Sequence, residues 1–144
     1  MCVDLNDITK GRVLMLNPVN LAGGYEIGAY KGVNPLGGNS PHYFMCVGRD
    51  GAYSYWSPLS SNKKPTGIGS ADGQGVIPKE SRAGFTHFAS GQTWYDTKQV
   101  WKIQNDFVIH AANTERSNRR EGEIFNQIAS SFIDSVFSGA RELK

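Results

Sequence analysis

Two runs of aromatic and aliphatic residues flank the Asp50-Gly51 pair, and this arrangement constrains the fold more than any other stretch of the chain. The first run covers residues 42–47, and the second covers residues 52–57 and ends at Pro58. An Asp-Gly pair between two such runs is typical of a β-hairpin turn. Such a hairpin brings the start of its first arm near the residues that follow its second arm. The side chains expected to meet at this edge of a sheet are His42, Ser60, Ser61 and Lys63.

Shorter apolar runs predict additional strands around this hairpin. Glycine-rich stretches at residues 21–41 and 65–75 predict loops, and we interpret the first as a loop that covers a substrate. Tyr25 to Lys31, inside that stretch, could form a short strand pair or a flap. A polar turn is expected at residues 91–96. The other predicted strands are residues 12–16, 76–78, 85–89, 99–103 and 107–109.

The C-terminal part of the chain has the apolar spacing of a helix, which we expect over residues 119–142. Ser117 or Asn118 could cap its start. One apolar face consists of Ile124, Phe125, Ile128, Phe132, Ile133, Val136 and Phe137. The fold class expected is mainly β with α: a small antiparallel β-barrel or curled sheet with a C-terminal helix.

Length and composition fit one domain over residues 1–144, with 39% hydrophobic residues and a formal net charge of +2. Such a charge does not by itself indicate a polyanionic partner. No apolar run is long enough to cross a bilayer. The N-terminus lacks the features of a signal peptide. Because Cys2 and Cys46 have neither metal-site spacing nor a disulfide pattern, we expect a cytoplasmic, reduced protein.

The order of these features resembles the Kid/MazF/PemK superfamily of toxin endoribonucleases, including the ToxN/AbiQ-like toxins of RNA-antitoxin systems. The similar parts are the opening strand at Lys10 to Leu16, a glycine-containing loop, the strand at Pro41 to Val47 and the C-terminal helix. The most specific similarity is Pro58-Leu59-Ser60-Ser61-Asn62-Lys63-Lys64, which is similar to a Pro-Leu-Thr-Ser element followed by lysine. The resemblance implies an SH3-like or Kid-like barrel.

In this family the 2′-hydroxyl of the RNA attacks the adjacent phosphate, with neither a metal nor a cofactor. The resemblance implies that Ser60 and Ser61 hold the scissile phosphate and that Lys63 balances its charge. His42 falls where the family places lysine or arginine. Since histidine has an unperturbed pKa of about 6.5, this departure favours proton transfer as its role.

RNA also needs surfaces that bind phosphates and stack on bases. We interpret the aromatic and basic residues near the glycine-rich and polar turns and near the helix start as such groups. The predicted RNA-binding residues are Tyr30, Lys31, Lys64, Trp94, Arg116, Arg119 and Arg120. The resemblance further implies a cognate antitoxin (RNA or protein), and suggests a homodimer; no membrane partner is expected.

Other interpretations remain open at this point. The same barrel could be a non-catalytic module that binds nucleic acid or protein, because fold does not dictate function. A hydrolase that uses Cys46 or Cys2 as its nucleophile is a third hypothesis. Finally, the polar residues that follow the hairpin could be an ordinary solvated surface.

Overall fold

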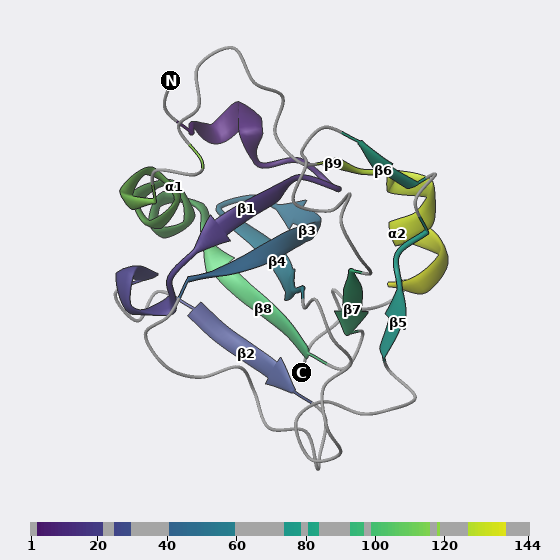
Figure 1. The fold of residues 1–144 in the computed structure, drawn as a ribbon. Helices are drawn as coiled ribbons and strands as arrows, with labels where there is room; N and C mark the ends of the chain where they lie inside the picture. Colours follow the sequence, from purple (N-terminus) through teal and green to yellow (C-terminus); the bar gives the residue numbers. More distant parts are fainter. Residues whose placement is uncertain are drawn as a thin grey trace.

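The structure is a computed structural model that describes residues 3–21, 25–29, 41–59, 74–78, 81–83, 93–96, 99–115, 118 and 127–137. These residues form a mainly antiparallel β structure with two α-helices (Figure 1). The central sheet has five strands in the order β1-β3-β4-β8-β2, and every pair in it is antiparallel. Its strands are β1 (Val13–Leu16), β2 (Tyr25–Ala29), β3 (His42–Asp50), β4 (Tyr53–Pro58) and β8 (Gln99–Gln104).

Among the described residues, two small ribbons and four helical segments surround this sheet. Strand β5 (Gln74–Val76) pairs with β7 (Trp94–Asp96), and β6 (Arg82–Ala83) pairs with β9 (Gln127–Ile128). The helical segments are α1 (Asn105–Thr114), α2 (Ser130–Val136) and the 3-10 helices η1 (Leu5–Asp7) and η2 (Pro18–Leu21).

The predicted hairpin is confirmed as β3 and β4. Asp50 pairs with Tyr53, so the two turn residues are Gly51 and Ala52, one position later than the Asp-Gly pair suggested. Gly51 has a φ of +61°, which suits the first central position of a type II′ turn. Between Cys46 and Gly48 the register shifts by one residue, so β3 carries a bulge opposite β4.

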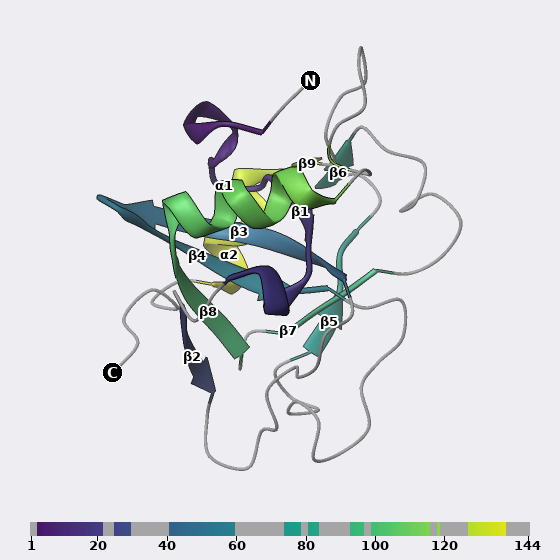
Figure 2. The ribbon, with the colours of Figure 1, turned by 90° about the vertical axis from the view of Figure 1, so that its left-hand side faces the viewer.

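Both faces of the sheet are buried, which explains why the central strands are apolar almost without interruption. Along β3, Phe44 and Cys46 belong to one core cluster, and Met45 and Val47 belong to the other. Helix α1 packs on the first face through Val108, Ala111 and Ala112. Helix α2 packs on the second face through Ile133, and Phe137, the residue that follows the helix, packs on the same face. Figure 2 shows the two helices on either side of the strands.

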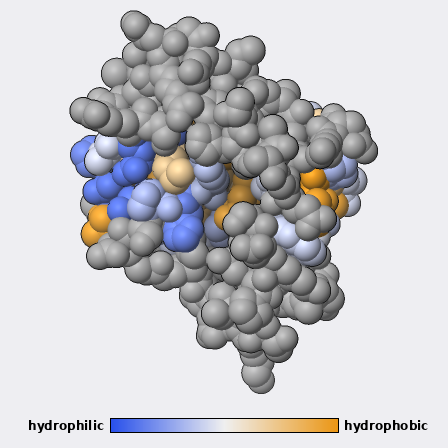
Figure 3. Space-filling model, in the orientation of Figure 1, coloured by the Kyte–Doolittle hydropathy of each residue, from blue (hydrophilic) through white to orange (hydrophobic). Residues whose placement is uncertain are grey.

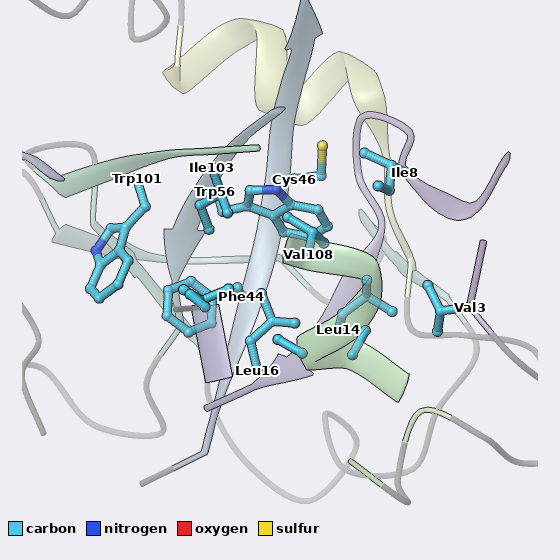
Figure 4. Close-up of a cluster of buried hydrophobic side chains, with 13 residues drawn as sticks. Val3, Ile8, Leu14, Leu16, Phe44, Cys46, Trp56, Trp101, Ile103 and Val108 are labelled. Carbon is cyan, nitrogen blue, oxygen red and sulfur yellow. The ribbon is translucent and has the colours of Figure 1, made fainter. Parts of the chain in front are cut away.

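The first core cluster contains the largest buried side chains of the molecule (Figure 4). Phe44 meets Trp101 edge to face, with ring centroids 5.3 Å apart. Trp56 is fully buried, and its indole N–H donates to Ser54 Oγ at 2.7 Å, so its polar atom is satisfied inside the core. The strands that carry the candidate site are therefore held rigidly in their middle.

Three sequence expectations about secondary structure are wrong. Residues 107–109 belong to helix α1 rather than a strand, because Val108 begins a helical apolar face that fills the first core. One continuous helix over 119–142 is excluded, since Gln127–Ile128 is a strand and α2 begins only at Ser130. Trp94–Asp96 is a strand of the β5–β7 ribbon rather than a turn.

Other expectations have mixed outcomes. The strands predicted at 12–16 and 99–103 are confirmed as β1 and β8, and the strand at 76–78 is close to β5. Within the predicted flap, β2 does not form its own strand pair but joins the central sheet beside β8. The strand predicted at residues 85–89 lies outside the described residues.

Candidate active site at the open end of the β3–β4 hairpin

The hairpin has two ends, which we name the turn end (Arg49 to Ser54) and the open end (His42 to Phe44 with Pro58 and Leu59). His42 is the first residue of β3, lies at the open end and is half-buried. It pairs with Leu16 of β1 in the sheet register. Because Leu16 and Phe44 belong to the first core cluster, alternation along the strands places His42 on the sheet face that α1 covers.

The β3–β4 ladder reaches its last described contact directly beside His42. Phe44 pairs with Pro58, and the Leu59 N–H donates to the Tyr43 carbonyl at 2.8 Å. Tyr43 and Leu59 both belong to the second core, as expected for residues opposite each other in an antiparallel pair. The predicted catalytic residues Ser60, Ser61 and Lys63, and also Lys64, lie outside the described residues, although Ser60 follows Leu59 directly in the chain.

Trp94 is half-buried on β7, where it pairs with Val76. Its neighbour Tyr95 packs against Phe132 and Phe137 of the second core, with centroid distances of 5.5 and 5.9 Å. The β5–β7 ribbon therefore lies over the sheet face opposite to that of His42. The structure does not bring Trp94 and His42 together on one face of the sheet. The other predicted RNA-binding residues, Tyr30, Lys31, Arg116, Arg119 and Arg120, lie outside the described residues.

Cys46 is unsuited to act as a nucleophile. Its side chain is fully buried in the first core, and its Sγ donates to the Gly48 carbonyl at 3.4 Å (Figure 4). Burial raises the pKa of the Cys46 thiol to about 12, although Arg49, Lys10 and Arg12 oppose that shift. Since the thiolate is the reactive form of cysteine, the hypothesis of a Cys46-dependent hydrolase is contradicted. Cys2 lies outside the described residues.

The turn end is fixed by side chains that the sequence did not identify. The Asn105 backbone N–H donates to the Ala52 carbonyl at 2.8 Å, and Asn105 Nδ2 donates to the Gly51 carbonyl at 3.1 Å. Arg49 Nη1 donates to the carbonyls of Leu5 and Ile8 at 3.1 and 3.4 Å. These partners lie far apart in sequence, so no local pattern indicates them.

Asn118 has a different role from the helix cap expected of it. Its Oδ1 accepts from the Met15 N–H at 2.9 Å, and its Nδ2 donates to the carbonyls of Met15 and Ala112 at 2.6 and 3.0 Å. The buried Asn118 amide thus joins the last turn of α1 to Met15 on the edge of β1. Met15 directly precedes Leu16, the residue that pairs with His42.

The described surface of the molecule is mixed in character. Lys102 Nζ lies 4.4 Å from the ring centroid of Tyr53, which is 37% exposed at the turn end. Among the coloured residues on the face seen in Figure 3, apolar colours form small separate areas. No group of three His, Cys, Asp or Glu side chains gathers anywhere in the described ranges. In the same part of the chain, no helix has the length and apolar character needed to cross a membrane.

The fold and the site geometry define a mainly antiparallel β protein with a half-buried histidine at the open end of its central hairpin. Comparison with known proteins adds no closer assignment. No family model, no curated protein and no solved structure matches the chain.

Proposed function

We propose that this protein is a metal-independent endoribonuclease with sequence preference, which cleaves RNA through the 2′-hydroxyl of its substrate. The observation that carries the proposal is the register at the open end. Tyr43 and Leu59 face each other there, so continuing the ladder by one residue would set Ser60 opposite His42. Opposite residues of an antiparallel pair share a face, and a base and a hydroxyl donor would then meet.

The reaction assigns each group a task. His42 takes the proton of the 2′-hydroxyl, whose oxygen bonds to the phosphorus while the bond from phosphorus to the 5′-oxygen breaks. The leaving 5′-oxygen takes a proton from solvent water, the proton held by His42 is returned to solvent, and a 2′,3′-cyclic phosphate remains on the other fragment. Ser60 and Ser61 donate to the non-bridging oxygens, and Lys63 balances the charge that grows on them.

RNA beyond the cut needs contacts of its own, which we assign by residue chemistry. The basic residues bind flanking phosphates, and the aromatic residues stack on unpaired bases. The residues proposed for this role are Tyr30, Lys31, Lys64, Trp94, Arg116, Arg119 and Arg120. Trp94 lies over the opposite sheet face from His42, so it contacts a more distant nucleotide than the one cleaved.

The biological setting is proposed from the resemblance to Kid/MazF/PemK and ToxN-like toxins alone. We propose an open SH3-like or Kid-like barrel that acts in the cytoplasm as the toxin of a toxin-antitoxin or phage-defence system. A cognate antitoxin, RNA or protein, holds it inactive. Induced expression of the wild-type chain is then expected to arrest growth, and expression of His42→Ala is not.

A single-turnover RNA cleavage assay with EDTA tests the chemistry directly. We expect wild-type protein to cleave RNA, and expect a substrate with a 2′-deoxy sugar at the cut site to stay intact. The Ser60→Ala/Ser61→Ala variant should be inactive, whereas Ser131→Ala, which removes an exposed hydroxyl on α2, should cleave normally. Absence of cleavage, or full activity in the double variant, would overturn the proposal. Salt-sensitive binding without cleavage would instead favour a non-catalytic RNA-binding module.

A further inference from the structure

Two asparagine side chains each hold one backbone residue by a pair of hydrogen bonds, but they hold different parts of the molecule. Asn113, in the last turn of α1, accepts from the Val3 N–H at 2.7 Å and donates to the Val3 carbonyl at 2.9 Å. Asn118 accepts from the N–H of Met15 and donates to its carbonyl in the same way. One asparagine therefore ties down the N-terminal segment, and the other ties down the edge of the central sheet.

The Asn118 amide is the more constrained of the two. Asn118 is 4% exposed, whereas Asn113 is half-buried. Its Nδ2 also donates to the Ala112 carbonyl at 3.0 Å, so the same amide joins β1 to α1. A buried amide with three hydrogen bonds is held in one orientation, and truncating it leaves buried backbone groups without their partners. The edge of β1 is therefore fixed relative to α1 at Met15.

A row of contacts leads from Met15 across the sheet to the open end of the hairpin. Met15 pairs with Tyr43 of β3, and the Tyr43 carbonyl accepts from the Leu59 N–H at 2.8 Å. We name this the Asn118 row, and its members are Asn118, Met15, Tyr43 and Leu59. His42 directly precedes the row on β3, and Ser60 directly follows Leu59 in the sequence. Both sides of the proposed cleavage site therefore adjoin the Asn118 row.

We propose that Asn118 is a positioning residue for RNA cleavage, because it holds one end of this row and through the row fixes the placement of His42. The inference rests on the proposed nuclease function. The Asn118 amide is engaged with the backbone of β1 and α1, so its effect falls on the rate of the chemical step rather than on RNA binding. A displacement of about 1 Å at a catalytic group can slow a reaction on the order of 10²-fold.

The test compares Asn118→Ala with Asn113→Ala, since each variant removes an amide that holds both backbone groups of one residue. In single-turnover assays at saturating RNA, Asn118→Ala should cleave about 10–100-fold more slowly than the wild type, with an unchanged RNA dissociation constant. Asn113→Ala should cleave at the wild-type rate. Equal rate losses in the folded fractions of both variants, or a loss explained by weaker RNA binding, would overturn the proposal.

Asn118→Ser keeps a hydroxyl at this position and repeats the comparison should Asn118→Ala fail to fold. The hydroxyl can replace one of the three hydrogen bonds of the amide, so we expect a smaller loss of rate in the same direction. A wild-type rate in folded Asn118→Ser would contradict the positioning role.

A second measurement separates this inference from the nuclease proposal. Under conditions in which all variants are folded, the Leu59 N–H should exchange with solvent faster in Asn118→Ala and at the wild-type rate in Asn113→Ala. The NMR signals of the His42 imidazole, assigned by their absence in His42→Gln, should shift in Asn118→Ala alone. These changes in a wild-type chain that does not cleave RNA would reject the nuclease and support the placement of His42 by Asn118. Unchanged Leu59 exchange and unchanged His42 signals would overturn the inference, whether or not RNA is cleaved.

Discussion

At the turn end of the β3–β4 hairpin, Asn105 donates to the carbonyls of Gly51 and Ala52, and Arg49 donates to the carbonyls of Leu5 and Ile8. At the open end, the last described ladder bond joins Leu59 to Tyr43, directly beside half-buried His42. Polar side chains at the turn end therefore donate hydrogen bonds to backbone carbonyls and hold the turn in place. The polar residues of the open end are those to which we assign chemistry, so the two ends should respond differently to substitution.

The largest expected effect is on catalysis at the open end. His42→Ala should slow RNA cleavage by about 10²–10⁴-fold in single-turnover assays, because it removes the proposed proton-transfer group. His42→Gln keeps a polar side chain of similar size and should be equally slow. Urea unfolding of both variants is the control, and His42→Gln should retain most of the wild-type stability. A wild-type cleavage rate in His42→Gln would contradict the assignment of catalysis to the open end.

The largest expected effect on stability lies at the turn end. Asn105→Asp should lower the free energy of unfolding by about 3 kcal/mol near neutral pH, because a buried carboxylate would face the Gly51 carbonyl without a donor. RNA cleavage by the folded fraction should be unchanged. Asn105→Ala is the milder control, since it also removes the Asn105 Oδ1 atom, which has no hydrogen-bond partner among the described residues.

The pH dependence of the Asn105→Asp variant has a definite sign. Its folded state favours the protonated form of the introduced carboxyl, because a carboxylic acid can donate to the Gly51 carbonyl as the Asn105 amide does. The pKa of the introduced carboxyl is therefore raised on folding, and its contribution to stability is present at low pH and lost as pH rises. The difference in stability between the variant and the wild type should shrink as the pH falls, which urea titrations at several pH values will measure.

A smaller effect is expected from the backbone of the turn. Gly51→Ala should cost about 1–2 kcal/mol, because residue 51 has a φ of +61° that L-residues adopt only with strain. A Cβ at this position would meet no atom within 4 Å, so the cost isolates backbone strain from steric contact. Gly51→Asn should cost less, since asparagine tolerates this region of φ. Equal losses in both variants, measured by urea unfolding, would contradict this account.

The sequence predicted the central hairpin because both of its arms are apolar and a turn pair separates them. It could not predict α1, where Phe107, Val108 and Ile109 locally favour a strand. The residues form a helix because Val108, Ala111 and Ala112 together cover the first core, which is a contact with distant strands. For the same reason Ile128, although it fits the helical spacing, lies on β9 and donates to the Gly11 carbonyl.

The candidate site was predictable to a similar extent. The hairpin pattern indicated that His42 lies at the open end, and the described ladder agrees up to Leu59. It did not indicate which sheet face each aromatic residue occupies, and so gave no sign that the β5–β7 ribbon, which carries Trp94, packs on the second core. Asn105 and Asn118 hydrogen-bond to Gly51 and Met15, more than fifty residues away in each case, and local sequence carries no signal for such contacts.

The middle of the hairpin provides the smallest expected effect and a reference for both ends. Burial raises the pKa of Cys46 from 9.0 to about 12, so folding favours the protonated thiol. This contribution to stability is complete below about pH 9 and is lost as the pH rises toward 12, by about 1.4 kcal/mol per pH unit. Urea unfolding between about pH 9 and about pH 10 should show stability falling by about 1 kcal/mol through this group in the wild type, a steeper slope than in Cys46→Ala. Identical slopes would mean that the Cys46 thiol ionises as easily in the folded protein as in the unfolded chain. That result would contradict a tightly packed, dry centre between the two ends of the hairpin.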